Sequence, residues 1–214
     1  MSDASPLLEE PWADLARQRD ASKLGIWIFL ASEVLFFGAL FLGYSVYRYQ
    51  HPAAFLAAAR ETNIWYGTAN TFVLLTSSLT MAIAAQAADA NAGFRRTIRW
   101  CLTATALLGL AFLVIKGFEY KEDIEERLLP GPDFKLALPA AQIFFAFYWT
   151  TTAVHAVHLT IGIALVTRLA WIGFRHKVPL EGNPQLQVTA LYWHLVDIIW
   201  IFLYPLLYLP GRNQ

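Results

Sequence analysis

One carboxyl group lies where hydrocarbon is expected. Glu33 is nine residues into an apolar run that begins at Leu24, about 13.5 Å along a helix axis and so close to the middle of a bilayer. An ionisable group at that depth is costly unless it pairs or faces protein, so it is a site hypothesis by default. Glu33 is either a protonated, hydrogen-bonded carboxyl that fixes one helix against another, or a proton-linked or lipid-contacting group.

Two further pairs of polar residues occupy the last two apolar runs. His155 and His158 are three residues apart, and His194 and Asp197 repeat that spacing. Residues at this spacing share one face of a helix. The second pair is therefore able to hydrogen-bond within its own helix.

Metal or haem ligation has to be considered because imidazole is a common ligand. A membrane cytochrome with two bis-histidine haems needs four membrane histidines, and this chain offers three, since His51 and His176 lie in expected loops. A single haem stays open as an alternative. The favoured role is structural, with the imidazoles hydrogen-bonded across helices to Thr, Asp or Glu33, each bond contributing roughly 0.6–2 kcal/mol. We assign no metal site and no catalytic residue.

Five long apolar segments must position these groups. A helix that crosses about 30 Å of hydrocarbon needs roughly 20 mostly apolar residues. The sequence therefore predicts an all-α integral membrane bundle, with an N-terminal segment at 1–23 and a tail at 210–214. The expected spans are about 24–46, 66–88, 98–119, 140–167 and 188–209.

Basic residues in the short loops predict the orientation, because cytoplasmic loops carry the excess of Lys and Arg. With the N-terminus cytoplasmic, the inner segments hold nine basic residues and the outer segments six. The third loop, expected at Lys121–Pro139, is acidic and suits the outer face. We expect a bacterial inner-membrane protein with its N-terminus in the cytoplasm and its C-terminus in the periplasm.

The composition excludes several classes of function. Apolar residues make up 57% and charged residues 15%, against about 25% charged in soluble domains. A formal net charge of zero gives no field for nucleic acid. The single cysteine, Cys101, excludes an intramolecular disulfide and a cysteine-rich metal site. No phosphate loop, nucleophile elbow, zinc-protease spacing or dinucleotide fingerprint occurs.

Five stretches, taken together and in order, resemble one known family. They are KLGIWIFLASEVLFF at 23–37, NTFVLLTSSLTMA at 70–82, LGLAFLVIKGFEY at 108–120, FAFYWTTTAVHAVHLTIG at 145–162 and YWHLVDIIWIFLY at 192–204. This set is similar to subunit III of the haem–copper respiratory oxidases, which include cytochrome c and quinol oxidases. The chain starts at the helix that carries the glutamate, so it resembles the five-helix bacterial form.

The resemblance implies a fold and a role. The expected fold is a helical bundle with a V-shaped cleft that holds phospholipids. The expected role is to bind subunit I, where haems, copper and oxygen reduction reside, to stabilise that subunit and to sustain proton uptake in a proton-pumping complex. Other expected partners are subunit II, small subunits of the complex and a respiratory supercomplex. This chain itself is expected to hold no cofactor.

The resemblance also implies roles for single residues. Glu33 matches the intramembrane carboxylate of the family. The polar positions of its last two helices are matched by His155, His158, His194 and Asp197. Two further residues, Arg168 and Arg175, are candidates to hold lipid phosphates at the cytoplasmic edge.

Three alternatives remain beside the oxidase interpretation. The first is the related accessory membrane subunit of bacterial nitric oxide reductases. The second is an independent haem b electron carrier, which a reduced-minus-oxidised spectrum of the isolated chain would reveal. The third is a proton-coupled transporter that uses Glu33, although transporters favour broken helices and internal symmetry.

Overall fold

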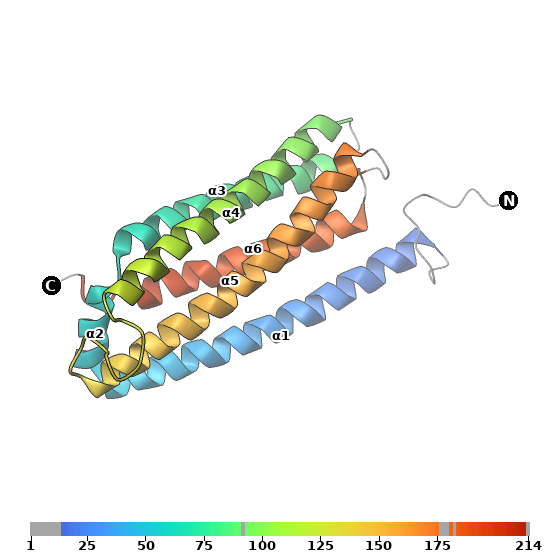
Figure 1. Cartoon of the computed structure of the whole chain (residues 1–214). Coiled ribbons are helices and arrows are strands. Elements are labelled where there is room, and N and C mark those ends of the chain that lie inside the picture. The colour runs from blue at the N-terminus through green and yellow to red at the C-terminus, as the bar shows by residue number, and fades with distance from the viewer. Residues whose placement is uncertain (1–13, 91–92, 176–179, 182, 213–214) are drawn as a thin grey trace.

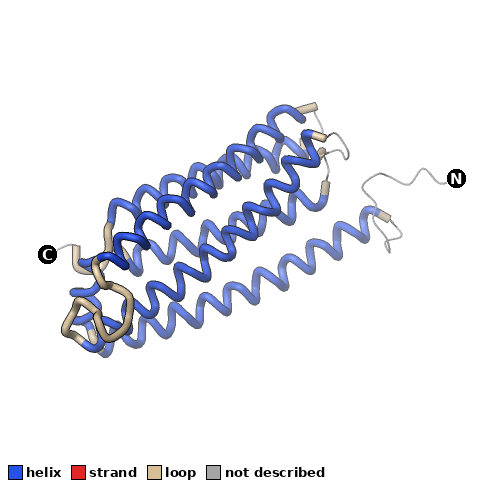
Figure 2. Tube along the Cα trace, in the orientation of Figure 1, coloured by secondary structure: helices blue, strands red, loops and turns tan. Residues whose placement is uncertain are grey.

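The described part of the chain, seen in a computed structural model, forms six helices (Figure 1). The described residues are 14–90, 93–175, 180–181 and 183–212, and within them every regular element is a helix (Figure 2). The helices are α1 Leu15–Gln50, α2 Pro52–Glu61, α3 Ile64–Asp89, α4 Arg95–Glu125, α5 Pro139–Phe174 and α6 Pro184–Leu207. All except α2 are long and apolar enough to cross a membrane. The predicted all-α bundle of five membrane helices is therefore confirmed.

Local sequence signals set where the helices begin. The Asn63 side chain accepts a hydrogen bond from the Trp65 N–H, and Asn183 does the same for the Gln185 N–H. These contacts satisfy N–H groups that have no partner inside the helix. Pro52 ends α1 and starts α2, because a proline cannot donate to the preceding turn but suits a first helical position.

Helices α3, α4, α5 and α6 form a ring in which each packs against its two neighbours, and α1 lies outside it against α5 and α6 (Figure 1). In the most apolar stretch of α6, 56% of residues are buried inside the chain, against 17% for α1. Helix α6 is thus the central element of the bundle. Helix α1 keeps most of its surface for lipid or a partner protein.

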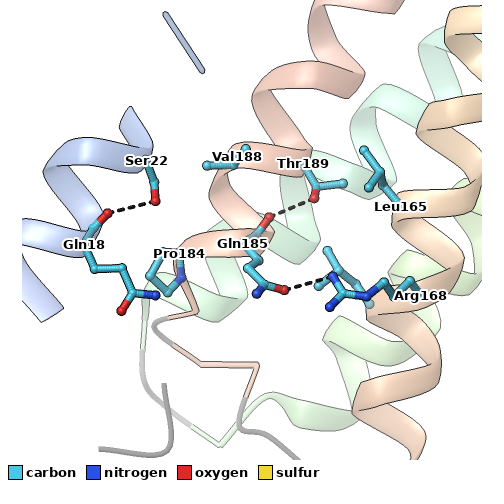
Figure 3. Close-up of a pocket in the computed structure, with 9 residues that line it drawn as sticks. Gln18, Ser22, Leu165, Arg168, Pro184, Gln185, Val188 and Thr189 are labelled. Atoms are coloured by element: carbon cyan, nitrogen blue, oxygen red, sulfur yellow. Dashed lines mark hydrogen bonds between the residues drawn. The ribbon is translucent and has the colours of Figure 1, made fainter. Parts of the chain in front are cut away.

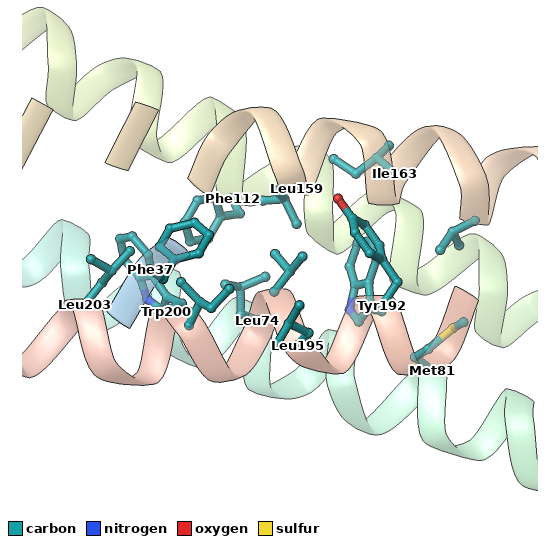
Figure 4. Packing of buried hydrophobic residues seen from close by; sticks show 14 of the residues in the cluster. Phe37, Leu74, Met81, Phe112, Leu159, Ile163, Tyr192, Leu195, Trp200 and Leu203 are labelled. Atoms are coloured by element: carbon teal, nitrogen blue, oxygen red, sulfur yellow. The ribbon is translucent and has the colours of Figure 1, made fainter. Parts of the chain in front are cut away.

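Large side chains fill the interior of the ring, and its helices lie close together. Phe112, Trp200 and Leu74 meet in its interior, and Phe37 reaches the same cluster from α1 (Figure 4). Helix α4 comes near α5 and α6 at Gly109, where an added Cβ would lie 2.8 Å from the Trp193 ring. Small residues at such contacts let membrane helices pack closely.

One end of the bundle is tied together by polar contacts. Arg60 of α2 donates to the Gly211 carbonyl at 3.0 Å, which fixes the C-terminal segment on α2. Lys135 of the α4–α5 loop lies 2.6 Å from Glu61 and 3.1 Å from Glu126. Hydrogen bonds to two carboxylates raise the pKa of Lys135, and the bond to Glu61 has a larger effect than the bond to Glu126.

Two expectations about the connections are corrected. The stretch between the first two spans contains helix α2, whose buried face is mostly alanine and which was expected to be loop. The loop expected at Lys121–Pro139 begins later, because α4 continues to Glu125. In that extra helix Asp123 is buried and is hydrogen-bonded to the Tyr148 hydroxyl of α5 at 2.7 Å. The expected flanks at 1–23 and 210–214 lie partly outside the described residues.

Candidate functional site

The Glu33 carboxyl faces an imidazole across the α1–α5 contact. Its Oε2 lies 3.0 Å from Nε2 of His158, and the two side chains are only 15% and 17% exposed. Glu33 is thus held between two helices while remaining close to the bilayer side of the bundle. The expectation that an imidazole bonds Glu33 across helices is confirmed for this histidine.

The other nitrogen of His158 defines the number of protons in this pair. Its Nδ1 lies 2.8 Å from the Val154 carbonyl, which can only accept, so Nδ1 carries a hydrogen. The Nε2–Oε2 contact therefore needs one proton, either on a neutral carboxylic acid or on an imidazolium that faces a carboxylate. In both forms the pair has no net charge, as suits a hydrocarbon setting.

Aromatic groups hold His158 in place. The Phe37 ring meets the imidazole edge to face, with centroids 5.5 Å apart. Tyr192 of α6 donates to the His158 carbonyl at 2.9 Å, and Phe29 of α1 packs against Tyr192 at 5.9 Å. The Glu33–His158 pair therefore lies where α1, α5 and α6 meet.

His155 does not join this pair. It is fully buried, and its ring packs against Phe112 at 5.6 Å and Trp200 at 5.2 Å. Neither ring nitrogen has a hydrogen-bond partner among the residues that the structure describes. The expectation that every membrane imidazole is satisfied across helices is wrong here.

His194 and Asp197 share a helical face but do not pair with each other in the described structure. Nδ1 of His194 lies 2.9 Å from the Ser78 hydroxyl of α3. Neither oxygen of Asp197 has a hydrogen-bond partner within the described part of the chain, although Ser78 is close enough to interact electrostatically. The hydrogen-bond partner of His194 therefore comes from α3 and not from its own helix.

A groove of about 570 Å³ runs between α1 and α6. Trp27 and Leu35 are among the α1 side chains on its wall, and Leu191 and Ile198 lie on the α6 side. The imidazole of His194 is its one titratable lining group. Its shape and apolar lining suit a hydrocarbon chain.

A second, more polar pocket of about 340 Å³ lies where the N-terminal end of α1 meets α5 and α6 (Figure 3). Arg168 lines it and donates to the Gln185 side chain at 3.2 Å. Arg175 is not among its lining residues, and its guanidinium stacks 4.6 Å over the Trp171 ring. Of the two arginines expected to hold phosphate, Arg168 therefore lines this pocket and Arg175 does not.

Helix α4 carries a cluster of buried charged residues that spacing along the chain predicts only in part. Lys116 and Glu119, three residues apart, pair at 3.0 Å in the interior. Asp123 joins them through Tyr148. The signal for Asp123 was its position seven residues after Lys116, on the same helical face.

The family model for cytochrome c oxidase subunit III matches residues 15–212. The chain belongs to this family. It is 28% identical to cytochrome c oxidase subunit 3 of Bacillus sp. (strain PS3), over 88% of this chain and 85% of that one. It is 29% identical to cytochrome bo(3) ubiquinol oxidase subunit 3 of Buchnera aphidicola, over 87% and 85%. The resemblance drawn from the sequence motifs is confirmed.

A third relative has a different chain organisation. Heme-copper oxidase subunit I+III of Aeropyrum pernix is 31% identical over 89% of this chain, which spans 23% of that longer protein. Family membership makes this chain a multi-pass membrane subunit of an oxidase complex that includes subunit I. Nothing in these relationships favours the nitric oxide reductase alternative.

Proposed function

We propose that this chain acts as the non-catalytic subunit III of a proton-pumping haem–copper terminal oxidase, binding subunit I and phospholipid and sustaining proton uptake. The observation that carries the proposal is the Glu33–His158 pair, a one-proton group near the bilayer side of a chain that belongs to the subunit III family. The haems and copper then belong to partner subunits. The Aeropyrum relative, named as subunit I joined to subunit III, supports direct contact with subunit I.

The three membrane histidines of this chain have surroundings that support a structural role. Nitrogens of His158 are used by Glu33 and Val154, and Ser78 bonds His194. His155 is enclosed by the Phe112 and Trp200 rings. These contacts favour the structural role of the three membrane histidines over the independent electron-carrier alternative.

The partner assignment can be tested on the native complex. The tagged chain is purified from native membranes in mild detergent, and its partners are identified by mass spectrometry. We expect subunit I, subunit II, small subunits and stoichiometric haem in the complex, with no haem on this chain alone. Recovery without subunit I, or a stoichiometric Soret band on the isolated chain, would overturn the assignment. Co-purification of further respiratory complexes would identify a supercomplex.

A phospholipid bridging the polar pocket and the apolar groove is part of the proposal. Val188 lines the pocket and Leu191 lines the groove, so the two spaces are one turn apart along α6. Arg168 and the N-terminal end of α6 would face the phosphate. The first carries a full positive charge, and the second carries the partial positive charge of a helix N-terminus. An acyl chain would then follow the groove between α1 and α6.

Arg168→Gln should reduce the phospholipid that co-purifies with the complex, because it removes the cation of the pocket. Arg175→Gln is the matched control, since its guanidinium stacks on Trp171 outside the pocket lining. Quantitative lipid mass spectrometry on both purified complexes measures the effect. Equal phospholipid content in the two variants would contradict the placement of the phosphate.

A further inference from the structure

A second group of buried polar side chains lies at the end of the bundle that carries α2 and the C-terminal segment. The Lys116 cluster, as we call it, consists of Lys116, Glu119 and Asp123 from α4, Tyr148 from α5, and Tyr208, which follows α6. None of the five is more than 4% exposed. The proposed oxidase role makes no use of this cluster.

Lys116 is fully engaged by neighbouring oxygens. Its Nζ donates to Glu119 Oε2 at 3.0 Å, to the Tyr148 hydroxyl at 3.0 Å and to the Tyr208 hydroxyl at 2.7 Å. An ammonium group has three hydrogens, so all are used. The same Nζ lies 4.5 Å from the centre of the Tyr148 ring, and the ring face further favours a cation.

The hydrogen-bond distances require one more hydrogen in the cluster than it would contain with both carboxyl groups ionised. The Tyr148 hydroxyl lies 2.8 Å from Glu119 Oε1 and 2.7 Å from Asp123 Oδ2. A phenol has one hydrogen, which cannot lie on both lines. Two ionised carboxylates would leave one of these short oxygen pairs without a hydrogen between them. A carboxyl proton is therefore needed.

The contacts place this proton on Asp123. Glu119 receives hydrogen bonds from Lys116 and from Tyr208, the latter at 2.7 Å, in addition to the Tyr148 contact. Asp123 has only the Tyr148 hydroxyl as a side-chain partner in the described structure. A carboxylate with more donors is the better-stabilised anion, so Glu119 is the ionised member.

Charge balance gives the same result independently. Lys116 and Glu119 form a buried pair with zero net charge. An ionised Asp123 would add an uncompensated negative charge to a site that is nearly closed to solvent, which is strongly unfavourable. A neutral Asp123 leaves the cluster without net charge.

We propose that the Lys116 cluster is a proton-binding site, in which Asp123 holds one exchangeable proton and the Lys116–Glu119 pair is a fixed ionic partner. Asp123 is two residues from the end of α4, so the exchange is with the aqueous face at this end of the bundle. The titratable groups that face it are Lys116, Glu119, Tyr120 and Glu122 of α4, Tyr148 of α5, and Tyr208.

When Asp123 loses its proton, rotation of one hydroxyl group gives the new carboxylate a hydrogen bond. As the Asp123 proton passes to water, the Tyr148 O–H turns from Glu119 to the new Asp123 carboxylate. Glu119 keeps the hydrogen bonds from Lys116 and Tyr208. No covalent bond other than the carboxylic O–H is broken, and no oxidant or reductant is needed.

A pair of amide substitutions in the intact oxidase complex tests which carboxyl is neutral. Asp123→Asn imitates a neutral acid, so the complex should assemble with its thermal midpoint nearly unchanged. Glu119→Gln leaves the Lys116 cation without its counter-charge, so the midpoint should fall clearly or assembly should fail. The reverse order of stability would overturn the proposal, as would equal losses in both variants.

Infrared spectroscopy of the complex provides a readout that stability alone does not. At neutral pH the wild type should show a neutral carboxylic C=O band that moves in D₂O buffer, that Asp123→Asn removes and that Asp123→Glu shifts. Glu125→Gln is the control. It removes an exposed carboxylate on the same helix and should keep the band. Glu33 and Asp197 are the other candidate acids of this chain, and a Glu33→Gln, Asp197→Asn background removes both. Identical carboxylic bands in the wild type and Asp123→Asn would show that Asp123 is ionised and would overturn the proposal.

Discussion

At the scale of single residues, the acids Glu33 and Asp123 both lie in membrane-spanning helices, and their charge is removed in different ways. Glu33 has one partner, the His158 imidazole, whereas Asp123 shares a phenol with the anion of an ion pair. One proton removes the net charge in each case. The two acids lie at different depths, so a substitution at one should leave the other intact.

Glu33→Ala should leave haem content and initial oxygen consumption unchanged and should shorten the period over which the enzyme sustains turnover, or reduce its bound lipid. The reason is that the variant removes the partner of His158 without touching a redox centre. Oxygen consumption followed over many turnovers, with lipid analysis, measures this. Loss of haem from the variant complex would contradict the assignment.

These residue contacts also show how far the sequence could be interpreted. The depth of Glu33 and the shared face of Lys116 and Glu119 follow from spacing along one helix. The Ser78–His194 contact does not, because it depends on which face of α3 meets α6. Pairings between helices need the tertiary structure.

At the scale of the elements, the ring of α3 to α6 depends on close backbone approach. Gly109 of α4 lies against the side chains of Trp193 and Ile163. Hydropathy along the chain predicted these helices as spans, since it depends only on local composition. It did not predict α2, whose ten residues are too few to cross a membrane and whose alanines pack under α5.

Gly109→Ala should destabilise the bundle by about 1–3 kcal/mol, the usual cost of overpacking a filled interior. An added Cβ would lie 2.8 Å from Trp193 and 2.9 Å from Ile163. Gly117→Ala on the same helix is the matched control, because its added Cβ meets nothing within 4 Å. Thermal unfolding in detergent compares the two. Equal midpoints would mean that α4 does not pack as closely as described.

At the scale of the whole molecule, both the α4–α5 loop and the C-terminal segment lie at the α2 end, and the last turn of α3 and the first turn of α4 lie at the other (Figure 1). The sequence predicts that the α2 end is periplasmic. The charge pattern that supports this prediction comes from the residues between the spans.

Single cysteines on a Cys101→Ser background should determine the orientation. Asp133→Cys, in the α4–α5 loop, should react with a membrane-impermeant maleimide added to intact spheroplasts. Gly93→Cys, before α4, should react only after the membrane is opened. The opposite pattern of labelling would reverse the predicted orientation.

The outer position of α1 has a consequence for biosynthesis. Glu33 is translated first, and its partner His158 follows 125 residues later. At about 5–20 residues per second, the first helix waits roughly 6–25 s for α5. During that interval its carboxyl is without the imidazole that it contacts in the folded chain. The Glu33–His158 contact therefore forms only after α5 has been synthesised, and the first helix has to be inserted without it.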